Sequence, residues 1–177
     1  VSCWMSVWGA RVMTYRALQK LDAEPAIAVV VQRMIQPQKS GVMFTVDPAQ
    51  PQSTRVVIEG AFGLGEVVVS GQVEPDTYVV DKKDLQVVEA RIGIKSHKIV
   101  ATADGQARVE LSGEESTRRV LTDAEIVEIA RMGRNIETHY GCAQDIEWAI
   151  SDDGLFILQS RPITTLNMPT KASAATG

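Results

Sequence analysis

Hydrophobic and polar positions along the chain predict a series of short strands with a helix near each end. Apolar residues recur at helical spacing over residues 2–20, where Trp4 and Trp8 lie one turn apart, and again over residues 122–140. Between these helices, short β-branched runs are bounded by Pro, Gly and polar residues, which is typical of strands. Strands grouped in hairpins predict an α+β fold with a mostly antiparallel sheet, rather than alternating βαβ units.

Six segments carry the strand pattern. The first, AIAVVVQRMI, is apolar almost throughout and predicts a buried strand. The polar stretch over 96–121 predicts irregular structure. The predicted strands cover residues 26–35, 42–46, 56–62, 76–81 and 86–95, followed by a hairpin within 145–162.

The second helix has clear end signals. Thr122 is suited to the N-cap position, and Glu125 three residues later completes a capping box. Gly141 is suited to end the helix in a left-handed conformation. The stripe expected to be buried comprises Ile126, Ile129, Ala130, Met132 and Ile136.

The hairpin DIEWAISDDGLFILQSRP, residues 145–162, has a register that depends on the length of its turn. A four-residue Ser-Asp-Asp-Gly turn would place Glu147 and Gln159 on opposite faces. A three-residue Asp-Asp-Gly turn, with the glycine left-handed, would place Glu147 opposite Gln159 and Asp145 opposite Arg161, all on one face. In that register the core face would carry Ile146, Trp148, Phe156 and Leu158.

Two interpretations of that polar face remain open from the pattern alone. A carboxylate beside an amide oxygen suits Mg²⁺, and a guanidinium nearby suits a phosphate, so the four groups could hold a magnesium nucleotide. A solvated sheet face with ordinary cross-strand pairs would show the same residues.

Composition and charge narrow the class of protein. The 177 residues are 45% hydrophobic and 23% charged, as in an ordinary globular protein, and the formal net charge is −4. A net negative charge without a basic stripe argues against a nucleic-acid partner, and no apolar run is long enough to span a membrane. Cys3 and Cys142 lie far apart and in no metal-ligand spacing, which predicts reduced packing residues of a cytoplasmic protein.

Several unusual segments, taken in order, resemble the ATP-binding domain of the phosphoenolpyruvate synthase and pyruvate phosphate dikinase family. They are CWMSVWGARVMTYR, VVVQRMI followed by SGVMFTVDP, VIEGAFGLGEVVVSGQVEPDTYVV, HYGCAQDIEWAI and LFILQSRPIT. Rifampin phosphotransferase shares this domain. The resemblance implies an ATP-grasp fold, in which ATP lies between two β-rich lobes, and enzymes that pass the β-phosphate of ATP to a histidine and then to pyruvate.

The same resemblance assigns roles to individual residues. Glu147 and Gln159 resemble the family's Mg-ATP ligands, Arg161 resembles the arginine that contacts the phosphates, and Asp145 the supporting carboxylate. The segment VVVQRMI resembles the hinge that reads adenine, with Gln32, Met34 and Ile35 nearby. The glycine-rich segment lacks a P-loop lysine and fails G-x-G-x-x-G. The resemblance places it by the nucleotide, through Gly63, Gly65 and Glu66.

The motif GIKSHKIV contains a Ser-His pair, but the family's acceptor histidine belongs to a separate domain. We therefore expect a surface or loop position for His97, and solvated side chains for Lys95 and Lys98, which could also touch phosphates.

The extent of the resemblance suggests a partial domain. Residues 1–166 resemble the C-terminal portion of the ATP-grasp domain, and residues 167–177 read as a linker or tail. The expected partners are ATP, the missing N-terminal half, the phosphohistidine domain and the pyruvate-binding domain of a longer parent. We expect the fragment alone to be inactive, and apolar surface at Trp4, Trp8 and the valine run to be exposed or covered in a homodimer. The alternatives are the ATP domain of a rifampin phosphotransferase and a non-catalytic binding module.

Overall fold

The computed structural model describes residues 2–18, 20–21, 24–50, 52–103 and 105–163. It divides into two compact units, Val1–Met34 and Ile35–Gly177, which we describe separately. The predicted linker over 167–177 lies outside the described residues.

The first unit contains three short helical segments, α1 (Ser2–Met5), η1 (Ser6–Trp8) and α2 (Ala10–Leu18). The helix predicted over residues 2–20 is interrupted at Gly9, whose ψ of 145° is extended. None of its described residues is buried, and Trp4 and Trp8 are each 59% exposed. The expectation of exposed apolar surface at these two tryptophans is therefore confirmed.

The prediction of a strand over residues 26–35 is wrong. Residues 24–37 form neither helix nor strand, and Val30 and Val31 are 83% and 97% exposed. A strand needs a neighbour for its backbone N–H and C=O groups, and no described strand pairs with this run. An apolar sequence alone therefore does not make this run a strand.

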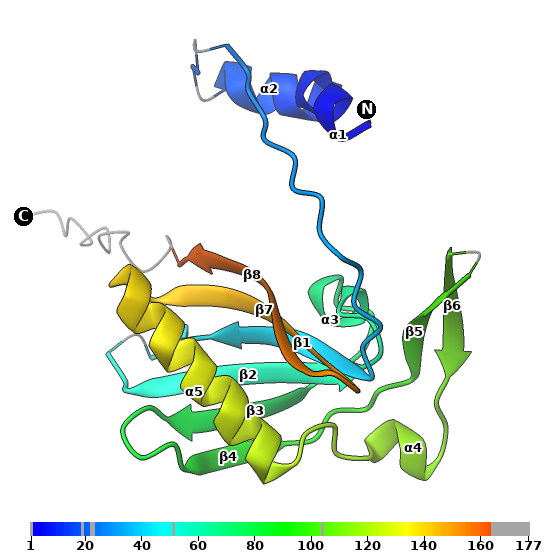
Figure 1. Ribbon diagram of the computed structural model, residues 1–177, viewed down its shortest axis with the longest axis vertical. Helices are drawn as coiled ribbons and strands as arrows, with labels where there is room; N and C mark the ends of the chain where they lie inside the picture. The colour runs from blue at the N-terminus through cyan, green and yellow to red at the C-terminus, as the bar shows by residue number, and fades with distance from the viewer. Residues whose placement is uncertain (1, 19, 22–23, 51, 104, 164–177) are drawn as a thin grey trace, which may run out of the picture. The chain divides into compact units, whose positions relative to one another are not determined.

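The second unit is built on a six-stranded antiparallel sheet in the order β4-β3-β2-β1-β7-β8. Helix α5 crosses one face of this sheet (Figure 1), and the short helix α3 packs on Ala61 from the other face. The arrangement confirms an α+β fold with a mostly antiparallel sheet and flanking helices. The strands are β1 (Lys39–Phe44), β2 (Arg55–Phe62), β3 (Asp76–Asp81), β4 (Val87–Arg91), β7 (Gln144–Ser151) and β8 (Gly154–Pro162).

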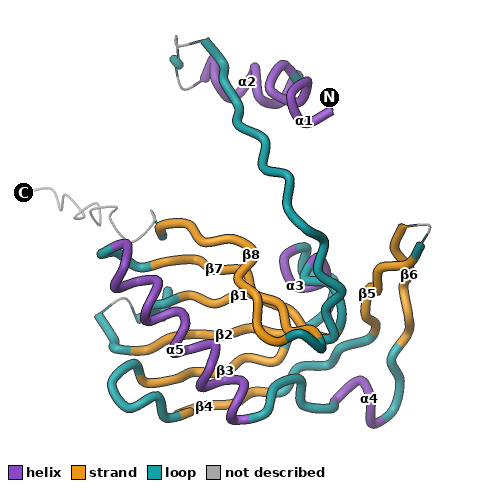
Figure 2. Tube along the Cα trace, in the orientation of Figure 1, coloured by secondary structure: helices purple, strands orange, loops and turns teal. Residues whose placement is uncertain are grey.

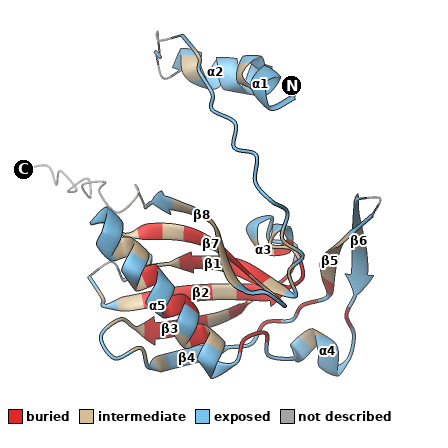
Figure 3. Ribbon diagram, viewed as in Figure 1, coloured by how far each residue is buried: buried red, intermediate tan, exposed pale blue. Residues whose placement is uncertain are grey.

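Helix α5 (Asp123–Tyr140) begins and ends as its sequence predicts. Thr122 accepts a hydrogen bond from the backbone N–H of Glu125, whose side chain accepts one from the backbone N–H of Thr122. Gly141 closes the helix in a left-handed conformation, with φ of 68°. The buried face of α5 packs on the sheet (Figure 3). Met132 belongs to the predicted stripe but is 38% exposed, so the prediction of burial is wrong for this residue.

A two-stranded hairpin and two short helices complete the unit (Figure 2). Strands β5 (His97–Thr102) and β6 (Gly105–Glu110) pair with each other, and α4 (Glu114–Thr117) follows them, while α3 (Glu66–Val69) follows β2. The prediction of irregular structure over 96–121 is therefore wrong. Its polar residues stay exposed along β6, so the segment lacks the alternation that marks a half-buried strand.

A buried polar cluster ties this hairpin to the sheet. Asp76 forms an ion pair with Lys95, and both side chains are fully buried. The Asp76 carboxylate also accepts hydrogen bonds from the Tyr78 hydroxyl at 2.8 Å and from the backbone N–H of Val120 at 2.7 Å. Removing one member would leave a buried charge without its partner, at a cost of about 3–5 kcal/mol.

Two sequence predictions fail at this cluster. Lys95 is neither solvated nor available to a phosphate, because it donates to Asp76 and to the carbonyl oxygen of Gly93. His97 is 2% exposed, in contact with Ser96 and Gln72, rather than on the surface. A polar sequence pattern cannot show that two polar side chains pair with each other in the interior of the protein.

The Tyr78 hydroxyl should make the stability of the fold depend on pH in the alkaline range. Burial raises the pKa of Tyr78 to about 12 from the ordinary value of 10.0. Below pH 10 the hydroxyl is neutral in both states; as the pH rises further, the unfolded chain ionises first and stability falls. We expect the free energy of unfolding to fall by about 2 kcal/mol as the pH rises from 10 to 12. Urea unfolding across this range measures it.

Two variants isolate the Tyr78 contribution to this alkaline loss. Tyr78→Phe should remove this part of the slope, whereas Tyr140→Phe should not, because Tyr140 is 58% exposed. An identical slope in wild type and Tyr78→Phe would assign the alkaline loss to other groups.

No helix among the described residues is long and apolar enough to cross a membrane. Cys3 and Cys142 are both free thiols and both exposed, so the prediction that they are packing residues is wrong.

Candidate functional site

The hairpin β7–β8 has a two-residue turn and a β-bulge, in place of the predicted three-residue turn. Ser151 pairs with Gly154, so the turn consists of the two aspartates between them. The ladder continues regularly to the pair Trp148–Ile157 and then skips Leu158. One extra residue in β8 is thus accommodated within the strand rather than in the turn.

The bulge produces the pairing that the sequence predicts. Beyond it, Glu147 lies opposite Gln159 and Asp145 lies opposite Arg161, so both predicted pairs are confirmed. Between the turn and the bulge, however, the β8 side chains point to the opposite faces of the sheet from those predicted. The β8 residues that pack on the core are Leu155 and Ile157, instead of the predicted Phe156 and Leu158.

Three of the predicted site residues line one pocket of about 250 Å³ on the sheet face opposite α5. Asp145 and Glu147 come from β7, and Arg161 from β8. Val68 and Val69 of α3 form an apolar wall. Gln159 lies opposite Glu147 in the ladder but is not among the lining residues. The full lining is Val42, Phe44, Glu59, Val68, Val69, Asp145, Glu147 and Arg161.

Arg161 is held beside the pocket by Asp145. Its Nε and Nη2 lie 2.8 and 2.7 Å from the same oxygen, Oδ2. The arginine side chain is 66% exposed and the aspartate 17%, so the pair adds at most about 1 kcal/mol to stability. Its effect is to orient the guanidinium, whose other N–H groups remain available to an anion.

Glu59 is a pocket residue that sequence reasoning missed. Val42 of β1 pairs with Glu59 on one side and with Glu147 on the other. Neighbouring strands are about 4.8 Å apart, so the two glutamates sit on the same face roughly 10 Å apart at their Cα atoms. The strand order β2-β1-β7 brings them together, and no local pattern around Glu59 indicates that order.

The glycine-rich segment shapes the turn from β2 into α3. Gly63 has φ of +80°, and a Cβ there would lie 2.2 Å from the carbonyl oxygen of Ile99. Its carbonyl accepts a hydrogen bond from the buried hydroxyl of Ser40, and its N–H donates to Gln38. Gly65 is the N-cap residue of α3. The loop therefore fixes the helix that supplies Val68 and Val69, while Glu66 itself is exposed and outside the pocket lining.

A family model, described as the pyruvate phosphate dikinase AMP/ATP-binding domain, matches residues 1–176. The chain belongs to this family.

The curated relatives of this chain include phosphoenolpyruvate synthases and rifampicin phosphotransferases. A probable phosphoenolpyruvate synthase of Methanothermobacter thermautotrophicus is 46% identical over 96% of this chain, and the phosphoenolpyruvate synthase of Pyrococcus furiosus is 44% identical over 98%. The rifampicin phosphotransferase of Bacillus subtilis is 40% identical over 93% of the chain. The matched region is 25%, 22% and 19% of these relatives, so the chain spans a quarter of their length or less.

A magnesium ion, which the dikinase domain family implies, fits the donors present only in part. No group of three or more His, Cys, Asp or Glu side chains among the described residues is placed to hold a metal. Glu147 and Gln159 supply one carboxylate and one amide oxygen, and Mg²⁺ is commonly held by one or two carboxylates together with substrate phosphates. The residues thus fit a magnesium ion whose remaining ligands are the phosphates of a nucleotide.

The remaining predicted residues lie outside the pocket. Gln32 and Met34 belong to the first unit, and Met34 is 68% exposed, while Ile35 begins the second unit. Their role at the adenine of a dikinase-type nucleotide site stays a prediction.

Proposed function

We propose that residues 1–166 form the C-terminal portion of an ATP-grasp nucleotide-binding domain, with 167–177 as a linker, in a phosphoenolpyruvate synthase. The observation that carries this proposal is the pocket in which Asp145, Glu147 and Arg161 meet opposite α5. Membership of the AMP/ATP-binding family and the names of the relatives support it. The parent would pass the β-phosphate of ATP through a phosphohistidine to pyruvate, in the cytoplasm.

Each residue at or beside the pocket has a chemical task in this proposal. Glu147 and Gln159 would hold Mg²⁺, which when bound neutralises the charge of the phosphates. Arg161 would contact the phosphates with the edge that Asp145 leaves available. The apolar side chains of α3 would limit the access of water to this wall.

The other contacts of the nucleotide complete the proposal. Gly63, Gly65 and Glu66 would lie by the nucleotide, and backbone groups near Gln32, Met34 and Ile35 would read the purine. The N-terminal half, the phosphohistidine domain and the pyruvate-binding domain would come from the rest of the parent, and a homodimer stays a prediction.

A chimera tests the proposal directly. Residues 1–166 would replace the aligned segment of the Methanothermobacter thermautotrophicus synthase, to which they are 46% identical. We expect the chimera to retain Mg-dependent formation of AMP and phosphoenolpyruvate from ATP and pyruvate. By contrast, isothermal titration of the chain alone with Mg-ATP should show weak binding and no hydrolysis, because it supplies one wall of the site.

Two results would contradict these expectations. A folded chimera without Mg-dependent nucleotide binding would favour a non-catalytic module. Micromolar affinity and hydrolysis by the chain alone would show that it is a complete site.

A rifampicin phosphotransferase is the second candidate, because the relatives of that name reach 44% identity. The phosphoryl acceptor separates the two, so activity with rifamycin but not pyruvate in the natural parent would favour it.

A further inference from the structure

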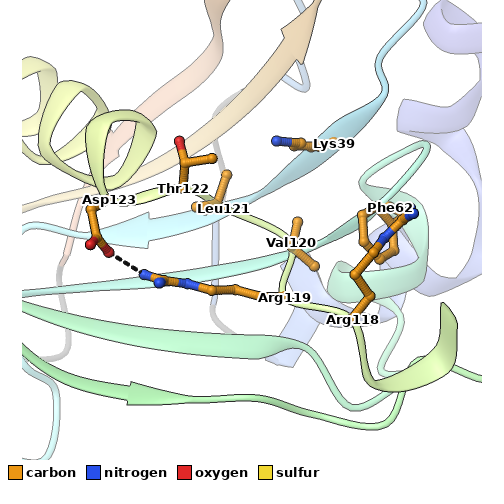
Figure 4. Close-up of a pocket in the computed structure, with 8 residues that line it drawn as sticks. All are labelled: Lys39, Phe62, Arg118, Arg119, Val120, Leu121, Thr122 and Asp123. Atoms are coloured by element: carbon orange, nitrogen blue, oxygen red, sulfur yellow. Dashed lines mark hydrogen bonds and ion pairs between the residues drawn. The ribbon is translucent and has the colours of Figure 1, made fainter. Parts of the chain in front are cut away.

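A second pocket, of about 470 Å³, lies on the α5 side of the sheet, away from the proposed nucleotide wall. Its floor is apolar, formed by Phe62, Val120 and Leu121, and its basic residues are Lys39, Arg118 and Arg119 (Figure 4). This concentration of positive charge occurs on a chain whose net charge is −4. Lys39 and Phe62 come from strands, and the others from the segment that leads into α5.

The two arginines are held against aromatic rings of neighbouring strands. The Arg118 guanidinium carbon lies 4.8 Å from the centre of the Phe62 ring, and that of Arg119 lies 5.5 Å from the centre of Tyr78. Stacking leaves the edges of a guanidinium open to an anion.

The backbone that carries these arginines is pinned by the buried cluster. The N–H of Val120 donates to Asp76 at 2.7 Å, and the N–H of Leu121 donates to the Tyr78 hydroxyl at 3.1 Å. Rigid support of this kind lowers the entropy cost of binding a ligand.

The three basic side chains of the pocket differ in whether a carboxylate is paired with them. Lys39 is paired with Glu125 at 2.7 Å, and Arg119 with Asp123 at 2.5 Å. Within the described part of the chain, no carboxylate forms a salt bridge with Arg118. Arg118 therefore offers a full guanidinium, while Arg119 retains N–H donors beyond the one directed at Asp123.

We propose that this pocket is a second binding site, which takes the phosphate group of a small phosphate monoester with an apolar or planar body. Arg118, which lies over Phe62 and forms no salt bridge with a carboxylate of the described residues, would hold two phosphate oxygens. The planar guanidinium presents a fork of N–H donors that matches two oxygens of a phosphate. The apolar floor would take the body of the ligand.

Phenyl phosphate is a suitable probe, followed by amide chemical shifts of the whole chain. We expect saturable shifts at residues 118–123 and Phe62, with a dissociation constant on the order of 1 mM. Inorganic phosphate should bind about tenfold more weakly, because it lacks the apolar body. Amides at Asp145 and Glu147 should not shift, which separates this site from the proposed nucleotide site.

Variants identify the residue responsible. Arg118→Ala should weaken phenyl phosphate binding at least about tenfold, because a charge-assisted hydrogen bond is lost. Arg131→Ala, an exposed arginine on α5, is the matched control and should leave binding unchanged.

Three results would overturn the proposal: no saturable shifts, equal affinity in Arg118→Ala and wild type, or shifts spread evenly over the basic surface. Equal affinity for inorganic phosphate would overturn the role of the apolar floor. Arg118 is exposed, so the variant should fold, and its dispersed spectrum would verify this.

Discussion

Replacing Glu147 by Ala in the chimera should lower ATP-dependent phosphorylation at least about a hundredfold, the usual scale for removing a group that stabilises reacting charge. Glu147 lines the pocket and lies opposite Gln159. Without it, the amide oxygen alone would face the metal. The measurement is the initial rate of AMP formation at saturating ATP and Mg²⁺.

The matched control is Glu89→Ala. Glu89 is an exposed glutamate on β4, outside the pocket lining, and its loss should leave the rate unchanged. A further variant, Glu147→Gln, keeps the shape and removes the charge, so it should restore little of the rate.

Substitution of Arg161 tests the proposed contact with the phosphates in the same assay. Arg161→Ala should be as damaging as Glu147→Ala, and Arg161→Lys should recover only part of the rate, because lysine cannot present a bidentate fork. Near-normal turnover in Glu147→Ala or Arg161→Ala would refute the assigned role of that residue.

Helix α5 shows where sequence reasoning works best. Its capping box and glycine end depend on contacts between residues three or four positions apart, so local chemistry determines both ends. The prediction that Met132 is buried was wrong because its exposure depends on how the helix lies across the sheet, which is not a local property.

The hairpin β7–β8 shows a correct pairing predicted for the wrong reason. The sequence contains one residue more than a regular ladder needs, and an Asp-Asp-Gly turn would absorb it cheaply. In the structure the bulge at Leu158 absorbs it instead. Both solutions place Gln159 opposite Glu147, so counting residues could predict the polar pairs but not the core residues between them.

Long-range arrangements were beyond the sequence pattern. Glu59 enters the pocket only because β1 lies between β2 and β7, and Lys95, in the segment between β4 and β5, is buried only because Asp76 of β3 pairs with it. The run over 26–35 illustrates the opposite case, in which an apolar sequence predicts a buried strand but residues 24–37 form neither helix nor strand, and Val30 and Val31 are exposed.

Gly41 should tolerate no larger residue, and Gly41→Ala should destabilise the second unit by about 3 kcal/mol or more. A Cβ at this position would lie 1.9 Å from the carbonyl oxygen of Glu59 and 2.8 Å from Cζ2 of Trp148. Gly41 pairs with Gly60 on one side and Trp148 on the other, so the two glycines make room for the indole. The indole Nε1 donates to the carbonyl oxygen of Val42 at 3.1 Å.

The position of the clash makes the prediction specific. Shortening Trp148 in a Gly41→Ala/Trp148→Leu double variant should not restore stability, because the nearest atom belongs to the backbone of β2 and cannot rotate away. Gly65→Ala is the control, since a Cβ there meets only Ser40 at an ordinary 3.5 Å. Urea unfolding of the three variants measures the differences.

A small effect of Gly41→Ala would show that β1 and β2 can separate without loss of the fold. A large effect would also bear on the pocket, because Val42 holds Glu59 and Glu147 on either side of β1. Any displacement of the strands that accommodates the methyl group would change the spacing of these two carboxylates. A Gly41→Ala chimera that still folds should therefore bind Mg-ATP more weakly than the unsubstituted chimera.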